Sequence, residues 1–165
     1  MKNIFRNKKG FSLIEMMVVV VILGLVVLAL VTFFTGGTIS WMAGQSQLKA
    51  QREARQAIDR MVREIREASD IIATSTPLEI NFNTPWSTNL KYSWLGNIWD
   101  PIFEGTNPLI NNVQSLTFTY FDNSGNSVDP ESASKVHINL KVDVDKDDNP
   151  DITLNTDVNL RNYDL

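Results

Sequence analysis

Carboxylates supply most of the side chains in this sequence that could do chemistry. Five aspartates crowd one short acidic stretch, at positions 143, 145, 147, 148 and 151. Alternate aspartates followed by further oxygen ligands suit a hard cation such as calcium, although Asp148 stands where an EF-hand loop needs glycine. An acidic hairpin turn whose charges resist aggregation is the alternative. The candidate calcium ligands are Asp143, Asp145, Asp147 and Asp151.

A single carboxylate, Glu15, stands at the edge of a long uncharged segment. No charged side chain occurs from residue 16 to residue 48, and residues 16–34 are almost wholly apolar. A helix of that apolar length rises about 28 Å, which is enough to cross the hydrocarbon core of a bilayer. A carboxylate beside such a span is costly and marks a functional position. Neither a plain anchor nor a secretory signal, which has a shorter apolar core, explains Glu15.

The residues before the apolar segment are basic. The first ten carry four basic side chains and no acid, namely Lys2, Arg6, Lys8 and Lys9. The positive-inside rule places this end of the chain in the cytoplasm. We therefore expect a single-pass membrane protein with its C-terminus outside the cytoplasm.

The segment from Lys8 to Met16 (KKGFSLIEM) resembles the signal of type IV prepilins and type II secretion pseudopilins. In that family a prepilin peptidase cuts after the glycine and methylates the new N-terminal phenylalanine. The resemblance implies cleavage between Gly10 and Phe11, N-methylation of Phe11, and a role for Glu15 in assembly. It also implies partners: the prepilin peptidase, other pilins or pseudopilins, the lipid bilayer and an inner-membrane assembly platform.

The residue types suit this processing. Gly10 has no side chain, so a peptidase can approach the backbone closely. Cleavage creates a cationic amine at Phe11, and Glu15 stands four residues further on, one helical turn along the same face. Glu15 can neutralise the amine of its own chain or that of a neighbouring subunit, and either pairing lowers the cost of a buried charge. The residue types do not choose between these two pairings of Glu15. The family resemblance favours pairing with the amine of a neighbouring subunit.

Apolar residues at spacings of three and four predict an amphipathic helix over residues 39–69. The stripe consists of Ile58, Met61, Val62, Ile65, Ala68 and Ile72. Joined to the membrane segment, it predicts one helix over residues 11–69. Its charged faces carry several i,i+4 pairs of opposite sign: Arg55–Asp59, Asp59–Arg63, Arg60–Glu64 and Arg63–Glu67. We interpret the arginines as a solvated face laced with ion pairs, with contacts to partner subunits or DNA as the alternative.

After residue 69 the pattern changes to short alternating strands separated by turn-rich stretches at residues 83–89, 96–107 and 122–134. Alternation marks residues 78–82, 90–94, 113–121, 136–144 and 152–160. No further helix-length periodic segment connects these strands, so we expect an antiparallel sheet covered by the helical stripe. The fold class is α+β and pilin-like. We expect a leader at 1–10, a transmembrane and assembly helix at 11–36, and an extracytoplasmic domain at 37–165 whose β-part spans 76–163.

The later part of the chain resembles W-type minor pilins and J-type pseudopilins. The resemblance lies in the helix of residues 55–68, the strand of residues 113–121 and residues 158–162 (VNLRN). It implies a minor subunit near the tip of a type IV pilus or a type II secretion pseudopilus. The alternative is a competence pseudopilin or a tip adhesin that binds DNA or a surface ligand.

The composition argues against other functions. The chain has no cysteine and one histidine, and no Gly-rich phosphate loop occurs, so we predict that the protein is no enzyme. Residues 70–165 carry five basic and fourteen acidic side chains, which makes nucleic-acid binding by that part unfavourable. Apart from a calcium ion, we expect no cofactor. Mature subunits are expected in the inner membrane, and then in a periplasmic pseudopilus or a surface pilus.

Overall fold

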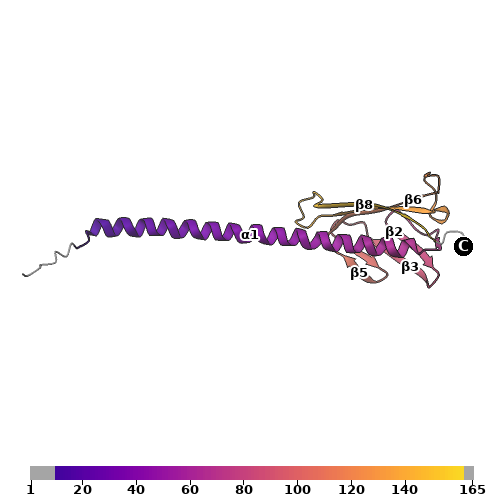
Figure 1. Ribbon diagram of the computed structural model, residues 1–165, viewed down its shortest axis with the longest axis horizontal. Coiled ribbons are helices and arrows are strands. Elements are labelled where there is room, and N and C mark those ends of the chain that lie inside the picture. Colours follow the sequence, from indigo (N-terminus) through magenta and orange to yellow (C-terminus); the bar gives the residue numbers. More distant parts are fainter. Residues whose placement is uncertain (1–9, 162–165) are drawn as a thin grey trace, which may run out of the picture. The chain divides into compact units, whose positions relative to one another are not determined.

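The computed structural model describes residues 10–161. Helix α1 (Leu13–Arg66) comes first and is followed by eight strands and one short 3₁₀ turn, η1 (Pro130–Ser132) (Figure 1). The chain divides into two compact units that meet between Ala43 and Gly44, and α1 contributes to both. The α+β class and the antiparallel strands predicted from the sequence are confirmed.

Helix α1 is shorter at both ends than the predicted helix of residues 11–69. It begins at Leu13, where the carbonyl of Ser12 accepts the first backbone hydrogen bond, from Met16 at 3.2 Å. At the other end, the amides of Glu67 and Ala68 bond carbonyls only three residues back, which tightens the last turn and ends the helix. Strand β1 then begins at Asp70.

The five strands that follow α1 form one antiparallel sheet in the order β1-β2-β3-β4-β5. Their bounds are β1 Asp70–Ile71, β2 Glu79–Thr84, β3 Ser87–Trp94, β4 Ile102–Glu104 and β5 Asn107–Ile110. Residues 96–107 were expected to form a turn, and that prediction is wrong for β4 and the start of β5. Their strands are too short to display a period-2 pattern, and pairing with β3 stabilises them.

The last three strands form a separate antiparallel sheet in the order β6-β7-β8. Their bounds are β6 Val113–Phe121, β7 Lys135–Val142 and β8 Ile152–Asn159. The predicted strands here agree closely, except that Val144 lies beyond the end of β7. The sequence led us to expect one sheet. The two sheets meet where the Phe118 amide donates to the Pro77 carbonyl at 2.8 Å.

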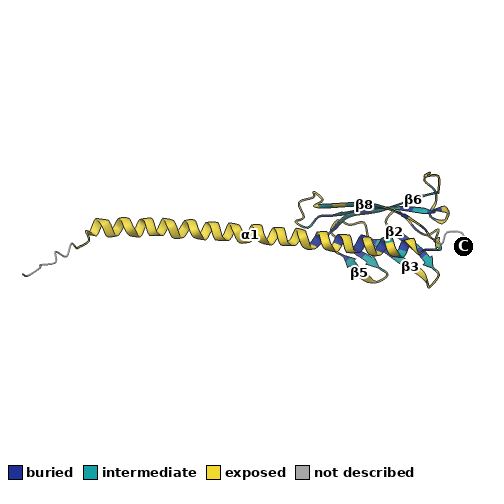
Figure 2. Ribbon diagram, in the orientation of Figure 1, coloured by how far each residue is buried: buried dark blue, intermediate teal, exposed yellow. Residues whose placement is uncertain are grey.

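Both sheets and the second part of α1 share one hydrophobic core. Four members of the predicted stripe are buried, namely Ile58, Met61, Ile65 and Ala68, whereas Val62 and Ile72 are half-buried. Ala68 and Ile72 lie beyond the end of α1. The buried helical residues are Ala50, Ala54, Ala57, Ile58, Met61 and Ile65. In Figure 2 the first part of α1 is exposed along its whole length, and buried colour appears only in its second part and beyond. The core therefore lies entirely within residues 50–160.

A polar network ties α1 to the first sheet. The hydroxyl of Tyr92 on β3 donates to Glu64 at 2.6 Å. Arg60 bridges Glu64 at 3.3 Å and Glu104 on β4 at 2.6 Å. Burial, followed by the charge of Glu64, raises the pKa of Tyr92. The tyrosine therefore stays neutral as a donor and helps to fix the register between helix and sheet.

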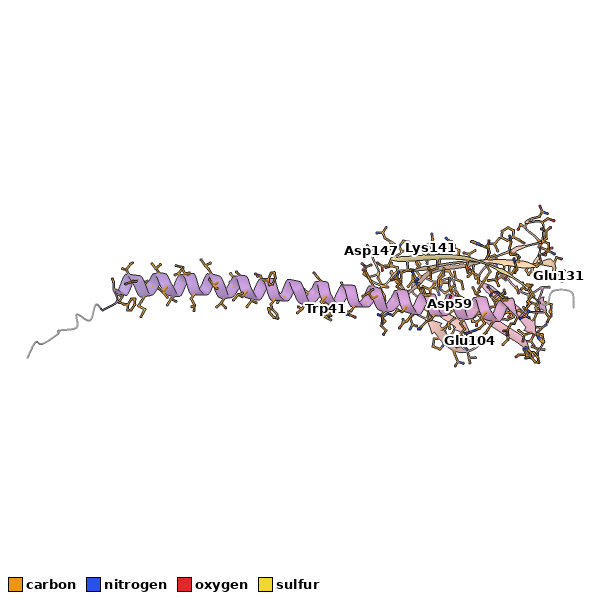
Figure 3. The ribbon with its side chains drawn as sticks, in the orientation of Figure 1. Trp41, Asp59, Glu104, Glu131, Lys141 and Asp147 are labelled. Atoms are coloured by element: carbon orange, nitrogen blue, oxygen red, sulfur yellow. The ribbon has the colours of Figure 1, made fainter. Side chains whose placement is uncertain are left out.

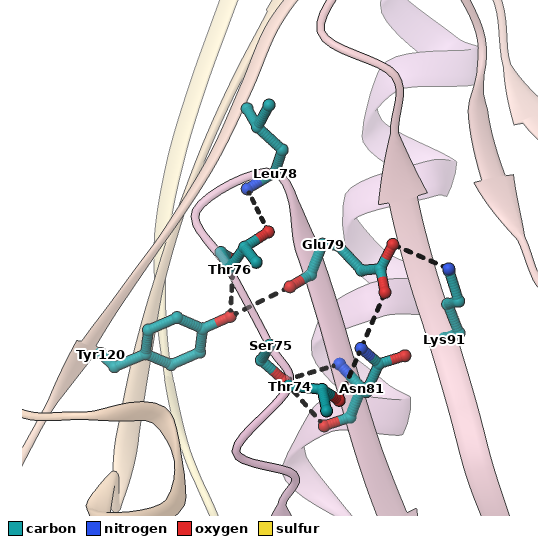
Figure 4. A network of polar contacts seen from close by, with 8 residues as sticks. All are labelled: Thr74, Ser75, Thr76, Leu78, Glu79, Asn81, Lys91 and Tyr120. Carbon is teal, nitrogen blue, oxygen red and sulfur yellow. Dashed lines mark hydrogen bonds and ion pairs between the residues drawn. The ribbon is translucent and has the colours of Figure 1, made fainter.

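A second network joins the two sheets, and Figure 4 shows it at close range. The hydroxyl of Tyr120 on β6 donates to the Thr76 carbonyl at 3.0 Å. On β2, Glu79 pairs with Lys91 of β3 at 2.7 Å. Burial raises the pKa of Tyr120, so this hydroxyl also remains a donor. These bonds satisfy polar groups where the sheets approach each other.

Candidate processing and assembly site

Residues 13–43 of α1 form an apolar helix that is exposed on every side. Its hydroxyls are satisfied within the helix, because Thr32 donates to the Leu28 carbonyl at 3.1 Å and Thr35 to that of Val31 at 3.0 Å. This helix is the one described element long and apolar enough to cross a membrane. An apolar surface of this size is unfavourable in water, so a bilayer or neighbouring helices must cover it.

Gly10 has no structural role in its own chain. A Cβ placed at this position would meet no atom within 4 Å, and its backbone is outside the left-handed region that favours glycine. Packing and backbone conformation therefore give no reason for glycine here. A partner that must approach the backbone closely would give a reason for glycine at this position.

Phe11 precedes the helix and is 74% exposed. The sequence suggested that Phe11 and Glu15 lie one helical turn apart. In the uncleaved chain they do not, because Phe11 and Ser12 lie outside α1. The described residues thus place the Gly10–Phe11 bond in an exposed segment that precedes the helix. Such a segment can enter a peptidase site without unfolding a helix. The basic leader residues Lys8 and Lys9 lie outside the described residues.

Glu15 occupies the first turn of α1 and is exposed. Ser12 and Glu15 stand at the spacing of a capping box, a signal that our reading of the sequence missed. A carboxylate in the first turn also complements the positive end of the helix dipole. Cleavage after Gly10 would add a cationic amine at that same end, so the need for a negative charge at Glu15 increases after processing.

The comparisons with known proteins bear on this N-terminal segment. The family described as "Prokaryotic N-terminal methylation motif" matches residues 5–31. The chain carries the type IV prepilin and pseudopilin signature. Searches of the curated proteins and of the solved structures gave no significant match. The matched range contains Gly10, Phe11, Glu15 and the first part of the apolar helix, and the signature belongs to structural subunits.

The acidic stretch after β7 brings together three of the four predicted calcium ligands. Carboxylate oxygens of Asp143, Asp145 and Asp151 lie within 4.8 Å of one another. Asp143 is fully buried. Its two oxygens accept the amides of Lys146 at 2.8 Å and Asp148 at 3.1 Å, which shapes the loop.

Asp147 stands outside this group of three. Its carboxylate accepts the Asn149 amide at 2.8 Å, and this bond lowers its pKa. Asp145 behaves in the opposite way: loss of hydration and then the charges of Asp147 and Asp151 raise its pKa. The loop is thus held by its own backbone hydrogen bonds and retains uncompensated negative charge. The calcium site stays a prediction from the sequence.

Ion pairs link side chains along the charged face of α1. Arg60 and Glu64 pair as predicted. Among residues 10–161, Arg55 and Asp59 are not within ion-pair distance, and the structure adds a pair between Lys49 and Glu53 at 3.7 Å. Figure 3 shows the side chain of Asp59 on this part of the helix. The arginines at 52 and 55 therefore face solvent without a carboxylate partner in the described chain.

The tryptophans of the second unit and the single histidine differ in burial. Trp94 is buried, whereas Trp86 at the β2–β3 turn is 86% exposed. Trp99 lies under the ammonium of Lys146, 5.4 Å from the centre of its ring. His137 on β7 pairs with Asp157 on β8 at 2.6 Å on the partly exposed face of the second sheet.

Proposed function

We propose that this protein is a minor pilin or pseudopilin subunit, processed after Gly10 and assembled through α1 near the tip of a type IV pilus or type II secretion pseudopilus. The observation that carries the proposal is a fully exposed apolar helix preceded by an accessible Gly10–Phe11 bond and followed by a self-contained core. Such a chain needs a bilayer before assembly and neighbouring helices after it. The methylation signature supports the same use of the segment.

The residues at the start of α1 then act in sequence. Gly10 lets the prepilin peptidase reach the backbone, and cleavage followed by N-methylation leaves a cationic secondary amine at Phe11. In the interior of a filament that charge would be far from water and costly without a partner. Glu15 supplies the carboxylate, either of the same chain or, as the family resemblance favours, of the adjoining subunit.

The subunit performs no catalysis in this proposal. Its precursor sits in the inner membrane with residues 44–165 outside the cytoplasm, in accord with the basic leader and the positive-inside rule. Its partners are the prepilin peptidase, the assembly platform and other pilins. The negative charge of the β-part favours binding to proteins over binding to nucleic acids.

The cleavage step is tested by replacing Gly10. We expect Gly10→Val to leave full-length precursor in the membrane, because a branched side chain blocks the close approach that the peptidase needs. Mass spectrometry of the purified protein reads the N-terminus. Gly24→Val is the matched control, since a Cβ at either glycine meets nothing within 4 Å. A mature N-terminus at Phe11 in the Gly10 variant would contradict the proposal.

A competence pseudopilin that contacts DNA is the second candidate. The unpaired arginines 52 and 55 on α1 favour it, since they offer phosphate contacts that no acid of the described chain occupies. A gel-shift assay with residues 45–165 tests this alternative. Binding that weakens steeply between low and physiological salt, and that is lost in Arg52→Ala with Arg55→Ala, would favour DNA.

A further inference from the structure

Each of the two sheets has two edge strands, and three of these four edges are closed within the described chain. Strand β1 has only two residues and lies beside η1, and β5 has four residues and contains Pro108. On β6, the Phe118 amide donates to the Pro77 carbonyl at 2.8 Å, and the Tyr120 carbonyl accepts the Val128 amide at 3.1 Å. Short strands, proline and covering segments are the devices by which proteins protect sheet edges.

The fourth edge, formed by β8, shows none of these devices among residues 10–161. Strand β8 is eight residues long, contains no proline and pairs with β7 in an unbroken register without a bulge. Its one charged side chain, Asp157, already pairs with His137 of β7 at 2.6 Å. A long, regular edge of this kind is a template for pairing with another strand.

The hydrogen-bond pattern shows which backbone groups of β8 point away from β7. The Leu160 amide donates to the Ser134 carbonyl at 2.9 Å, so these two residues are a hydrogen-bonded pair of the ladder. Because such pairs alternate along an antiparallel ladder, the amide and carbonyl of every second residue of β8 face the open edge. Within the described chain, no segment outside the sheet bonds these groups. The outward residues are Thr153, Asn155, Asp157 and Asn159.

The side chains on the inner face of β8 are incompletely covered. On β7, the inward side chains from Val136 to Val142 are at most 1% exposed. On β8, Ile152, Leu154 and Thr156 face the same core but are only half-buried. A further strand beside β8 would remove more of this apolar surface from water, which is favourable. The second sheet therefore has an open side both in its hydrogen bonds and in its core.

We propose that an extended segment of a different subunit adds to the open edge of β8 as a fourth strand of this sheet. A row of outward amides and carbonyls along a strand is complementary to the backbone of another strand, and such strand addition is an established mode of peptide recognition. Alternate side chains of the added segment would be apolar and cover Ile152 and Leu154. The others would be polar and lie beside Asn155. The inference rests on the proposed function, because assembly brings another subunit next to this one.

The closed edges also distinguish a different subunit from a second copy of this chain. A second copy offers only its own β8 for strand pairing, and pairing of two identical edges would produce a symmetric dimer. A minor subunit near a filament tip instead meets neighbours of other kinds. One added strand occupies the whole edge, so the contact does not repeat along the filament.

Hydrogen exchange of the full chain, measured amide by amide in a bilayer and in sheared filaments, tests the contact without a known partner. In the bilayer the amides of Asn155 and Asp157 should exchange freely, whereas pairing with β7 protects those of Leu154 and Thr156. In filaments the first two should slow at least about tenfold, and the other two should stay protected. Asn123, in an exposed turn, is the control and should exchange freely in both states.

Proline at position 155 removes an outward donor without breaking a bond to β7. Asn155→Pro should lower the amount of this subunit in filaments about tenfold, because the added strand loses a hydrogen bond. Asn155→Ala keeps the amide and is the matched control, so it should assemble normally. Thr156→Pro loses a bond to β7 and should melt well below Asn155→Pro. If Asn155→Pro also unfolds, exchange in the unaltered chain still decides.

Each remaining outcome is decisive. Equally fast exchange of the Asn155 and Asp157 amides in both states, in a chain that is processed to Phe11 and present in filaments, would overturn this inference and leave the proposed function standing. Protection already present in the bilayer would show that the chain itself or a second copy occupies the edge, which would also overturn it; dependence on protein concentration would identify the second copy. Absence of the processed chain from filaments would contradict the proposed function itself.

Discussion

At the scale of the residue, the most informative position is one whose type its own chain does not explain. Gly10 contacts nothing and adopts no conformation that requires glycine. Glu15 adjoins an apolar helix in which every other side chain up to residue 48 is uncharged. A partner that must approach the backbone closely would explain Gly10, whereas Glu15 complements the positive end of its own helix and would also neutralise an amine created by cleavage.

Neutralising Glu15 should separate processing from assembly. Glu15→Gln keeps the shape of the side chain and removes the charge, so cleavage at Gly10 should continue. Assembly should fail, because an amine buried without its carboxylate costs about 3–5 kcal/mol. Mass spectrometry of the N-terminus and the amount of protein in sheared filaments measure the two effects. Glu131→Gln, on the exposed turn η1, is the control and should assemble normally.

The acidic loop offers a second prediction at this scale. If Asp143, Asp145 and Asp151 bind calcium, a calcium concentration 100 times the Kd should stabilise the protein by about 2.7 kcal/mol. Thermal unfolding with calcium and with a chelator measures this shift. Asp145→Asn should abolish it and Asp129→Asn should not. An unchanged melting temperature in calcium would contradict the metal site and leave the loop as an acidic turn held by its own hydrogen bonds.

At the scale of the element, α1 has two surfaces with different requirements. Its first part is apolar all round, whereas its second part buries one stripe and exposes charges on the others. The residues of both parts favour a helix, so α1 continues without a break from the exposed apolar part into the part that packs on the sheets. What fixes the second half is packing of the stripe on the two sheets, assisted by the bond from Tyr92 to Glu64.

Removing a buried side chain from the stripe should destabilise the second unit strongly. Met61 is fully buried in the core, so Met61→Ala leaves a cavity and should cost about 2–5 kcal/mol. Arg55→Ala, on the exposed face of the same helix, should change stability by less than about 0.5 kcal/mol. Urea unfolding of residues 44–165, which contain the whole described core, measures both. Equal effects would mean that α1 does not pack as described.

The buried tyrosines predict a loss of stability at alkaline pH. The folded-state pKa values of Tyr92 and Tyr120 are raised above the unfolded value of about 10, chiefly by burial. The folded state then holds protons that the unfolded state has released, so stability is full below about pH 10 and falls as the pH rises further. A tyrosinate at position 92 would also face the carboxylate of Glu64.

Comparing the stability of the parent protein with that of Tyr92→Phe at several pH values isolates the contribution of Tyr92. Tyr92→Phe should be less stable than the parent at pH 8, because it loses the hydrogen bond to Glu64, a difference of about 1–3 kcal/mol. Above pH 10 the difference should shrink, since the variant has no group to ionise at this position. Thermal unfolding at pH 8, 10 and 11 measures both curves. Parallel curves would assign the alkaline loss to other groups.

At the scale of the whole molecule, the chain consists of two units that require different surroundings. The first has no core of its own and exposes apolar side chains, and the second holds all the described buried residues. A chain built in this way is stable only when a bilayer or other helices cover the first unit. The second unit should keep its fold whichever of these covers the first, since its core lies within residues 50–160.

The sequence by itself determined the local features of this protein. The uncharged segment, the stripe of α1, and strands β6, β7 and β8 follow from periodicities of 3.6 and 2, because each pattern is written in neighbouring residues. The signature of Gly10, Phe11 and Glu15 is equally local. Three of the four aspartates chosen as ligands also come together, since a single loop carries them all.

Only the tertiary structure decided what depends on distant residues. The division into two sheets, the short strands β4 and β5, and the burial of Asp143 all result from pairing between segments that no local pattern connects. The surface around the end of α1 likewise joins residues from α1, the β2–β3 turn and the end of the described chain. Such surfaces arise from long-range contacts, whereas Gly10 and Glu15 could be identified beforehand because their site is continuous in the chain.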